Sequence, residues 1–464
     1  MSLNRWLAAG VLASATAIFS GCASGSLAPS TPSMPASLMS NRWGELTPTS
    51  DAYQTTFKYV ETFYPIWFTY QQWQISSVNK LIGPARMTPV YHAVVAPNDD
   101  TLYGNTVVDL TTEPLILTIP ETKDVYSVLS TDAFGDINDT GITSEGVYGL
   151  YGPNGSGSLP KGVTPVPISS NYSGLIIRVD KYSGSGQNEK AEAELFRREL
   201  RAAPQSVWQK NHQAQPTRIL PVLFFSVPFK SIADTLATKE PTTFLNQLQA
   251  GVNSSFPPTL TADEQALSDR FNKLFNGRKS DASFIEATRK AHDAILNKYL
   301  THTGKTNWIT FDGIGTTWAP LLRSAISEFI QYANSHDTAA YYQTFTDGKG
   351  AALDGAAHSY VLTFAKNNIP EAKRFWSVTA YTPNSITLIR NPLHKYLVGS
   401  YTPGLRKSRD GSISIYVAQH QPKGIPTANW LPVDAERFNL MLRVYGPEGR
   451  VKAGLYVPPP VQAR

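Results

Sequence analysis

The sequence predicts a mainly β protein with a helical insert, an α+β arrangement in which two β-sandwiches flank a small helical domain. Two long regions alternate apolar and polar residues with the period of a β-strand, whereas the region between them repeats apolar residues with the period of a helix. The chain has 464 residues, which exceeds one ordinary hydrophobic core, so we expect two or three folded domains.

The N-terminal domain is assigned to residues 49–187. It opens with aromatic residues spaced three or four positions apart, which predict one or two helices bent at Pro65. Strand-like runs of β-branched and aromatic residues follow without intervening helices: 91–95, 106–110, 114–119, 125–129 and 174–179. Turn residues separate these runs at short intervals, which is typical of an antiparallel sandwich.

Residues 188–335 form the predicted helical domain. Thr261 with Glu264, and Ser283 with Glu286, have the spacing of a capping box, in which a hydroxyl and a carboxylate satisfy free amide groups at the start of a helix. Apolar residues after each box fall on one stripe, as expected for helices that pack on a core.

Residues 336–464 return to the strand period and predict a jelly-roll or similar double sheet. Within 438–445, alternation puts Leu442 on one face and Arg443 on the other. A central hairpin is predicted from the runs 374–381 and 385–392, because turn residues separate them.

The first 21 residues have the pattern of a signal peptide, with one charge, Arg5, before an apolar run too short to span a bilayer. The run ends in small residues before Cys22, which resembles the bacterial lipobox, where the cysteine is acylated. A plain cleaved signal peptide is the alternative. Residues 22–48 are rich in Ser and Pro and predict a disordered tether. We therefore expect a lipoprotein of the bacterial cell envelope, anchored in the outer membrane and facing the periplasm.

Composition excludes several other classes. Cys22 is the only cysteine, so we expect no disulfide, cysteine nucleophile or cysteine-bound metal in the mature chain. The formal net charge is +5 and the basic residues are scattered, so we expect no nucleic-acid partner. The oligomeric state stays open, a homo-oligomer included.

Two groups of motifs resemble known families. Residues 96–103, Ala-Pro-Asn-Asp-Asp-Thr-Leu-Tyr, with motifs at 108–110 and 126–128, resemble the bacterial family called domain of unknown function 1254. Residues 374–381, Arg-Phe-Trp-Ser-Val-Thr-Ala-Tyr, with a motif at 443–447, resemble its usual C-terminal partner, domain of unknown function 1214. The resemblance implies an immunoglobulin-like β-sandwich, a helical insert and a jelly-roll β-sandwich, and it implies no settled activity.

The densest polar motif is Asn98-Asp99-Asp100, with Tyr103 shortly after it. Asp99 and Asp100 are weak catalytic candidates, because paired carboxylates can share a proton or hold a hard cation. The alternative is turn chemistry, in which these side chains bond nearby amides. In an extended chain the two aspartates face opposite sides, so only one of them would face a given pocket. Asn98 and Tyr103 are candidate ligand-binding residues.

The C-terminal region supplies a second set of candidates. Its arginines can clamp a carboxylate or phosphate, and its aromatic rings can stack on a sugar or another flat surface. The candidate ligand-binding residues are Trp376, Arg390, Asn391, Trp430 and Arg443. The alternative is that they are core aromatics and interdomain contacts. His394 is a weak candidate for a general base.

No cofactor motif is evident and no metal site is predicted. The spacing of Asp132, Asp136 and Asp139 does not match an EF-hand loop, and a calcium-type ion with oxygen ligands stays open as an alternative. The eight histidines are dispersed without a His-Glu-x-x-His pattern, which disfavours a zinc hydrolase. The sequence also lacks a Gly-x-Ser-x-Gly nucleophile elbow.

These observations lead to two expectations. In the first, an envelope lipoprotein binds, and in one version hydrolyses, a small polar or glycan-like ligand between its two β-domains. In the second, the protein is a non-enzymatic structural or assembly protein of the envelope, and the same residues lock the two β-domains together. A cavity open to solvent would favour the first expectation and a dry interface the second. The sequence does not decide whether the protein is an enzyme.

Overall fold

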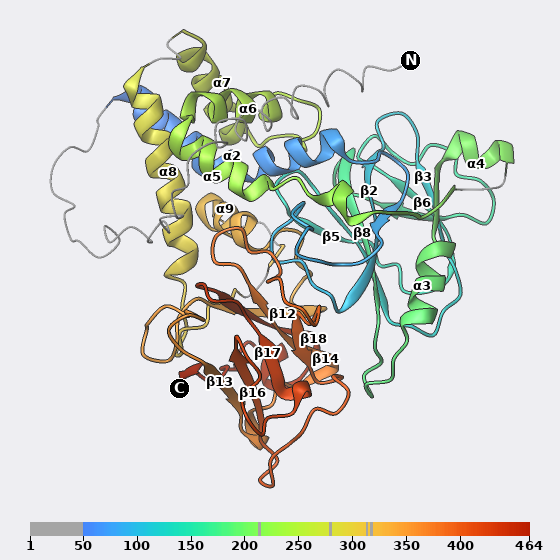
Figure 1. Ribbon diagram of the computed structural model, residues 1–464. Helices are drawn as coiled ribbons and strands as arrows, with labels where there is room; N and C mark the ends of the chain where they lie inside the picture. The colour runs from blue at the N-terminus through green and yellow to red at the C-terminus, as the bar shows by residue number, and fades with distance from the viewer. Residues whose placement is uncertain (1–49, 212–214, 278–280, 312–313, 316–318) are drawn as a thin grey trace.

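The computed structural model describes residues 50–464, apart from 212–214, 278–280, 312–313 and 316–318. The predicted signal peptide, lipidation site and tether lie outside these residues. Figure 1 shows a group of helices, an N-terminal β-sandwich beside it, and a C-terminal β-sandwich below both. The predicted fold class, mainly β with a helical portion, is confirmed. None of the helices in the described ranges combines the length and apolar character that a membrane span requires.

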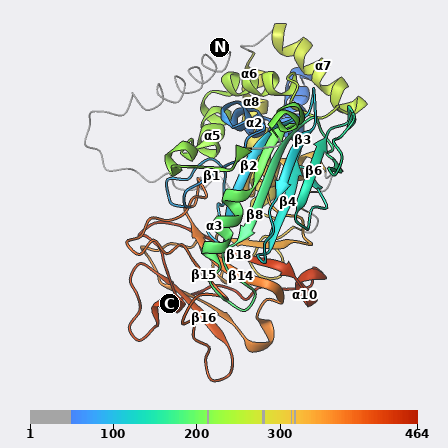
Figure 2. The same ribbon diagram turned by 90° about the vertical axis from the view of Figure 1, so that its right-hand side faces the viewer.

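The N-terminal sandwich consists of two sheets that share a core of aliphatic side chains. The larger sheet has the order β11 (Arg218–Leu220), β1 (Ile82–Pro84), β2 (Thr101–Asp109), β8 (Tyr172–Asp180), β4 (Tyr126–Thr131) and β5 (Ile137–Asp139). The smaller sheet has the order β10 (Gln215–Pro216), β9 (Arg201–Pro204), β3 (Leu115–Ile119), β6 (Gly146–Tyr151) and β7 (Thr164–Pro167). Helices α3 (Lys190–Glu199) and α4 (Gln205–Asn211) flank these sheets. Figure 2 shows β2 and β8 side by side, running toward the C-terminal sandwich.

Helix α2 (Asp51–Ile75) is the centre of the helical part. Ser50 caps it by accepting the amide of Tyr53, and Pro65 lies inside the helix without ending it. Its buried aromatic residues pack on the surrounding helices, which are α5 (Phe229–Lys239), α6 (Pro241–Val252), α7 (Ala262–Gly277), α8 (Ala282–Leu300) and α9 (Pro320–Phe329). The predicted capping box before α7 forms, with Thr261 and Glu264 bonded reciprocally.

The C-terminal sandwich consists of two four-stranded sheets around a second apolar core. One sheet has the order β12 (Ala339–Thr344), β18 (Asn439–Pro447), β14 (Ala372–Tyr381) and β15 (Leu397–Gly399). The other has the order β17 (Trp430–Pro432), β16 (Ile413–Ala418), β13 (Tyr360–Phe364) and β19 (Gln462–Ala463). The short helix α10 (Gly449–Lys452) follows β18.

Alternation along β14 and β18 decides what the first of these sheets presents to the rest of the molecule. Trp376 and Leu442 point into the core between the two C-terminal sheets. Phe375 and Tyr445 join the other core, which the helices and the N-terminal sandwich share. Arg443, one residue from Leu442, therefore lies on the face turned toward the N-terminal sandwich.

The predicted central hairpin is wrong in its second arm. The run 374–381 forms the main part of β14, but 385–392 is not a strand and pairs with β14 only through an isolated bridge between Tyr381 and Leu388. The neighbours of β14 are instead β18 and β15. Ile386 has φ = 50°, which turns the chain away from the extended path, and its carbonyl accepts the amide of Ala96.

Candidate functional site

The junction between the two sandwiches contains a buried carboxylate, Asp100, which lies directly before β2 and is 0% exposed. Three hydroxyl groups of the C-terminal sandwich donate to it. Ser377 Oγ lies at 2.9 Å and Tyr445 Oη at 3.2 Å, and Tyr401 Oη provides the third bond. We call Asp100, Ser377, Tyr401 and Tyr445 the junction network. It connects residues almost 350 positions apart in the chain, such as Asp100 and Tyr445.

Burial raises the pKa of Asp100 above its usual value, because the carboxylate loses its hydration. The bond from Tyr401 and the charge of Arg443 oppose part of this rise. Burial, together with the charge of Asp100, also raises the pKa of Tyr401 and Tyr445 well above their usual value. Both phenols therefore keep their protons and remain donors to the carboxylate.

Two ion pairs flank the junction network. Lys181 Nζ lies 2.6 Å from Asp99 Oδ1, and Arg374 binds Asp180 with both sides of its guanidinium group, with Nε 2.7 Å from Oδ2. The antiparallel register of β2 and β8 puts Thr101 opposite Asp180. The residues just before β2 and just after β8 therefore lie close together at one end of the strand pair. Burial raises the pKa of Asp180 to about 6, although Arg374 opposes the rise.

A cavity of about 70 Å³ lies beside the junction network, where both sandwiches meet the end of α9. We call it the junction cavity. Polar and aromatic side chains from all three parts line it, among them Asn98, Tyr103, Arg178, Tyr332, Tyr341 and Arg443. One water needs about 10–15 Å³ on this measure, so the cavity has room for a few small polar atoms.

Arg178 and Arg443 are the two cations of the junction cavity, with exposed fractions of 7% and 2%. Arg178 donates to Asn334 Oδ1 at 2.9 Å and to the carbonyl of Tyr332. Arg443 donates to Tyr381 Oη at 2.7 Å and to the carbonyl of Ala96 at 2.5 Å. Among the described residues, no carboxylate oxygen lies within 4.0 Å of either guanidinium group.

The backbone is strained at the two carbonyl groups that accept from these arginines. Ala96 has φ = 49° and Tyr332 has φ = 55°, values that side chains with a Cβ rarely adopt. Such conformations cost on the order of 1–3 kcal/mol each and persist where surrounding contacts hold them. Here each strained carbonyl binds a buried guanidinium group, so the strain is localised at the cavity wall.

The structure brings three of the predicted ligand-binding residues together. Asn98, Tyr103 and Arg443 all line the junction cavity. Asn98 connects the cavity to the junction network, since its Oδ1 accepts from Tyr103 Oη at 2.9 Å and its Nδ2 donates to Tyr445 Oη at 2.5 Å.

The other predicted residues lie elsewhere. Trp376 is in the C-terminal core, and Trp430 donates to the carbonyl of Ala418 at 2.9 Å. Asn391 stabilises its own loop, because its Oδ1 accepts the amide of Lys395 at 3.1 Å. Arg390 and His394 are exposed on the same loop. The three acids Asp132, Asp136 and Asp139 do not gather into an ion site in the described part of the chain. Asp132 instead stabilises a turn, in which its Oδ1 accepts the amides of Phe134 and Asp136.

Sequence reasoning missed Arg178, Tyr332 and the three hydroxyl donors of Asp100. One signal for Arg178 was present, because it is the single charged residue in the apolar strand 174–179. Ser377 and Tyr445 stand in the motifs 374–381 and 443–447, whereas Tyr332 and Tyr401 carry no signal. Only the tertiary fold brings these groups to the cavity or to Asp100.

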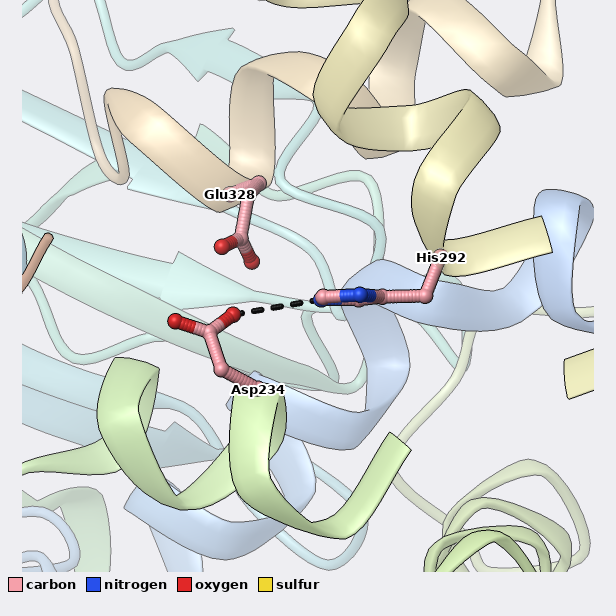
Figure 3. A group of neighbouring side chains, drawn as sticks. All are labelled: Asp234, His292 and Glu328. Carbon is pink, nitrogen blue, oxygen red and sulfur yellow. Dashed lines mark hydrogen bonds and ion pairs between the residues drawn. The ribbon is translucent and has the colours of Figure 1, made fainter. Parts of the chain in front are cut away.

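A second polar cluster lies inside the helical part (Figure 3). Asp234 of α5, His292 of α8 and Glu328 of α9 point toward one another, with ligand atoms within 4.8 Å. Imidazole and carboxylate groups are suitable ligands for a transition metal. However, the ammonium group of Lys230 already lies between the two carboxylates, 3.0 Å from Asp234 Oδ2 and in contact with Glu328 Oε1. The cluster is therefore an ion-pair cluster with an internal cation.

Charge balance explains the protonation of this cluster. Two carboxylates share one buried place with the ammonium group of Lys230 and the imidazole of His292, and the repulsion between the carboxylates favours a proton on one of them. Burial and the neighbouring Asp234 raise the pKa of Glu328, whereas Lys230 and His292 lower the pKa of Asp234 despite its burial. Glu328, which is 0% exposed and accepts from Tyr64 Oη at 2.7 Å, is the group that takes the extra proton.

Two β-sandwiches joined by a buried polar network and a helical part define the class of this protein. Residues 78–204 match a family described as a protein of unknown function, DUF1254, and residues 338–449 match a second one, DUF1214. The two matches cover about half of the chain, in the predicted order. The chain belongs to the proteins that carry DUF1254 followed by DUF1214.

Two solved structures are similar to this chain. The VPA0106 protein from Vibrio parahaemolyticus is 19% identical, and the match covers 89% of this chain and 100% of that one with a TM-score of 0.55. An uncharacterised protein from Burkholderia cenocepacia is 14% identical, with coverage of 89% and 94% and a TM-score of 0.43. The first of these likenesses shows a shared fold. The comparison with curated proteins gave no match.

The junction network predicts a large effect of Asp100→Ala. The substitution leaves three buried hydroxyl groups without their acceptor, so we expect the free energy of unfolding to fall by about 3 kcal/mol or more in urea denaturation. Asp139→Ala is the matched control, because this aspartate of the same sandwich is exposed and accepts the amide of Gly141. We expect a loss of about 1 kcal/mol there. Equal losses in the two variants would contradict the account of the network.

The ion-pair cluster predicts a pH dependence of stability. Because folding raises the pKa of Glu328 from 4.5 to about 7, this group stabilises the fold fully below pH 4.5, and its contribution is lost as the pH rises through about 7. Glu328→Gln keeps an acceptor and removes the titratable carboxyl group. We expect the wild type to lose about 1–3 kcal/mol more unfolding free energy than this variant between about pH 5 and pH 8. Parallel pH profiles in urea denaturation would rule out a protonated Glu328.

Proposed function

We propose that this protein binds a small carboxylate-bearing molecule in the junction cavity, and that acylated Cys22 anchors it in the bacterial outer membrane, facing the periplasm. One observation carries the binding proposal: Arg178 and Arg443, both buried, line the junction cavity, and neither contacts an acid within the described ranges. The charge of Asp100 acts on Arg443 without direct contact, so one buried carboxylate serves two buried cations. A carboxylate ligand would supply a second negative charge and fit the planar fork of a guanidinium group.

The size of the cavity supports a small ligand over a glycan-like one. About 70 Å³ has room for a carboxylate with a short carbon chain and is too small for a sugar ring. Tyr103 and Tyr341 would flank the carbon atoms with aromatic faces, and Asn98 would orient a polar atom beside them.

The geometry supports binding more than hydrolysis. A general base needs a free acceptor within reach of the proton that it removes. Both oxygens of Asp100 already accept hydroxyl groups, and Asp99 is paired with Lys181. His394 lies on an exposed loop and is not part of the cavity lining.

A structural role in the envelope is the second candidate, and the dry junction network favours it. Asp100 and Ser377 are both 0% exposed, so this part of the interface locks the two sandwiches without access for a ligand. The two roles are compatible, because the network and the junction cavity lie side by side and Asn98 belongs to both. Ligand binding distinguishes the candidates, since a purely structural protein requires no occupant of the cavity.

Acetate is the probe for the binding proposal. We expect millimolar acetate to raise the melting temperature of the wild type, because a ligand that binds only the folded state stabilises it. We expect Arg178→Gln to weaken acetate binding by about tenfold or more, as the loss of a charge-assisted bond implies. The acetate affinity of Arg178→Lys, which keeps the charge and loses the planar fork, should lie between those of the wild type and Arg178→Gln. Titration calorimetry and thermal shift measure these affinities.

Arg218→Gln is the matched control, because Arg218 is an exposed arginine of the same sheet and does not line the cavity. It should bind acetate as the wild type does. The absence of acetate binding in the wild type would refute the proposal, and so would equal affinity in a folded Arg178→Gln variant.

A further inference from the structure

A second pocket, of about 310 Å³, lies next to the junction cavity, and we call it the outer pocket. Met87 and Tyr103 line both spaces, so the two spaces are adjacent at these side chains. Six charged residues line the outer pocket: Arg86, Asp99, Lys181, Lys190, Glu194 and Arg197. Four cations against two acids give this pocket an excess of positive charge.

The ion pairs show which cations are available. Lys181 is paired with Asp99, and Arg197 is paired with Glu194. Arg86 and Lys190 form no ion pair with any acid in the described part of the chain, and both are exposed at the rim. Lys190 Nζ lies 5.2 Å from the centre of the Tyr182 ring, which is a cation–π contact and leaves its charge unneutralised.

Arg197 adds a buried donor to the lining of the outer pocket. It is 1% exposed, and Nη1 donates to the carbonyl of Pro84 at 2.8 Å while Nη2 contacts Glu194. Its Nε is buried without a hydrogen-bond partner. A buried donor without an acceptor is destabilising, and an anionic ligand in this pocket offers oxygen atoms that would accept from it.

Of the two side chains that line both spaces, Tyr103 is rigid and Met87 is flexible. Tyr103 is held by its bond to Asn98 at 2.9 Å and by Arg178, whose guanidinium group lies 5.6 Å from its ring centre. Met87 has an unbranched side chain with three rotatable bonds and adapts its shape at low cost. A rotation of Met87 is the simplest change that would join the two spaces.

We propose that the outer pocket and the junction cavity are two subsites for one ligand, which carries an anionic group at each end. This inference rests on the proposed function and specifies its ligand class. The inner carboxylate faces Arg178 and Arg443, a short carbon chain passes Met87 and Tyr103, and the outer anionic group faces Arg86, Lys190 and Arg197. Straight-chain dicarboxylates are the simplest molecules of this class.

The experiment compares acetate and butyrate with succinate, glutarate and adipate by titration calorimetry on the intact protein. We expect at least one dicarboxylate to bind about tenfold more tightly than either monocarboxylate at low ionic strength, because a second charge gains the outer cations. The gain should shrink in about 0.5 M NaCl, since exposed charges are screened.

The double variant Arg86→Met, Lys190→Met separates the two subsites. It should lose most of the dicarboxylate gain and bind acetate as the wild type does, whereas Arg178→Gln should weaken both ligand types. Lys123→Met, Lys161→Met is the matched control, because it removes two exposed lysines of the same domain away from the outer pocket. It should behave as the wild type.

The outcomes distinguish the two proposals. If acetate binds through Arg178 and dicarboxylates gain nothing, or if the gain survives in the Arg86 and Lys190 variant, the two-subsite inference is overturned and the proposed function stands. If neither monocarboxylates nor dicarboxylates bind, both are overturned.

Discussion

A carboxylate that one domain buries and the other domain satisfies is the constraint on which this structure depends. Asp100 belongs to the N-terminal sandwich, and all three of its hydroxyl donors belong to the C-terminal sandwich. A buried carboxylate without donors costs several kcal/mol, so neither sandwich can reach its final arrangement without the other. The ion pair of Asp180 with Arg374 likewise joins a carboxylate of the N-terminal sandwich to a donor of the C-terminal sandwich.

The junction cavity follows from this constraint. Asn98 precedes Asp100 by two residues and bonds Tyr445, so the network that joins the domains also positions one wall of the cavity. Arg443 comes from the strand that supplies Tyr445, and the pleat puts both side chains on the face toward the N-terminal sandwich. Two arginines can therefore converge on one small space, although they come from different domains and are 265 positions apart.

The alternation of apolar and polar residues allowed much of this arrangement to be predicted from the sequence. Contacts between segments that are distant in the chain could not be predicted in this way. The pattern along 438–445 assigned Leu442 and Arg443 to opposite faces, and the structure has them there. The motif around Asn98 identified the other side of the junction. The run 385–392 has the composition of a strand, yet Ile386 turns the chain because its carbonyl bonds Ala96 in the other domain. A local pattern contains no information about such a partner.

Arg178 and the ion-pair cluster illustrate the same limit. The single arginine in strand 174–179 is visible in the sequence, but its neighbours Asn334 and Tyr332 arrive from the end of the helical part. Lys230, Asp234, His292 and Glu328 come from three separate helices, and each is unremarkable in its own segment. At both places a charged side chain is buried among polar partners. The buried charge identifies such a place in the structure, whereas no sequence motif does.

Differential scanning calorimetry of the intact protein tests the central claim, that the two sandwiches form one cooperative unit through the junction network. The account predicts a single unfolding transition whose calorimetric and van't Hoff enthalpies agree, because neither sandwich can release the other without exposing an unpaired buried group. Two resolved transitions, one for each sandwich, would contradict it.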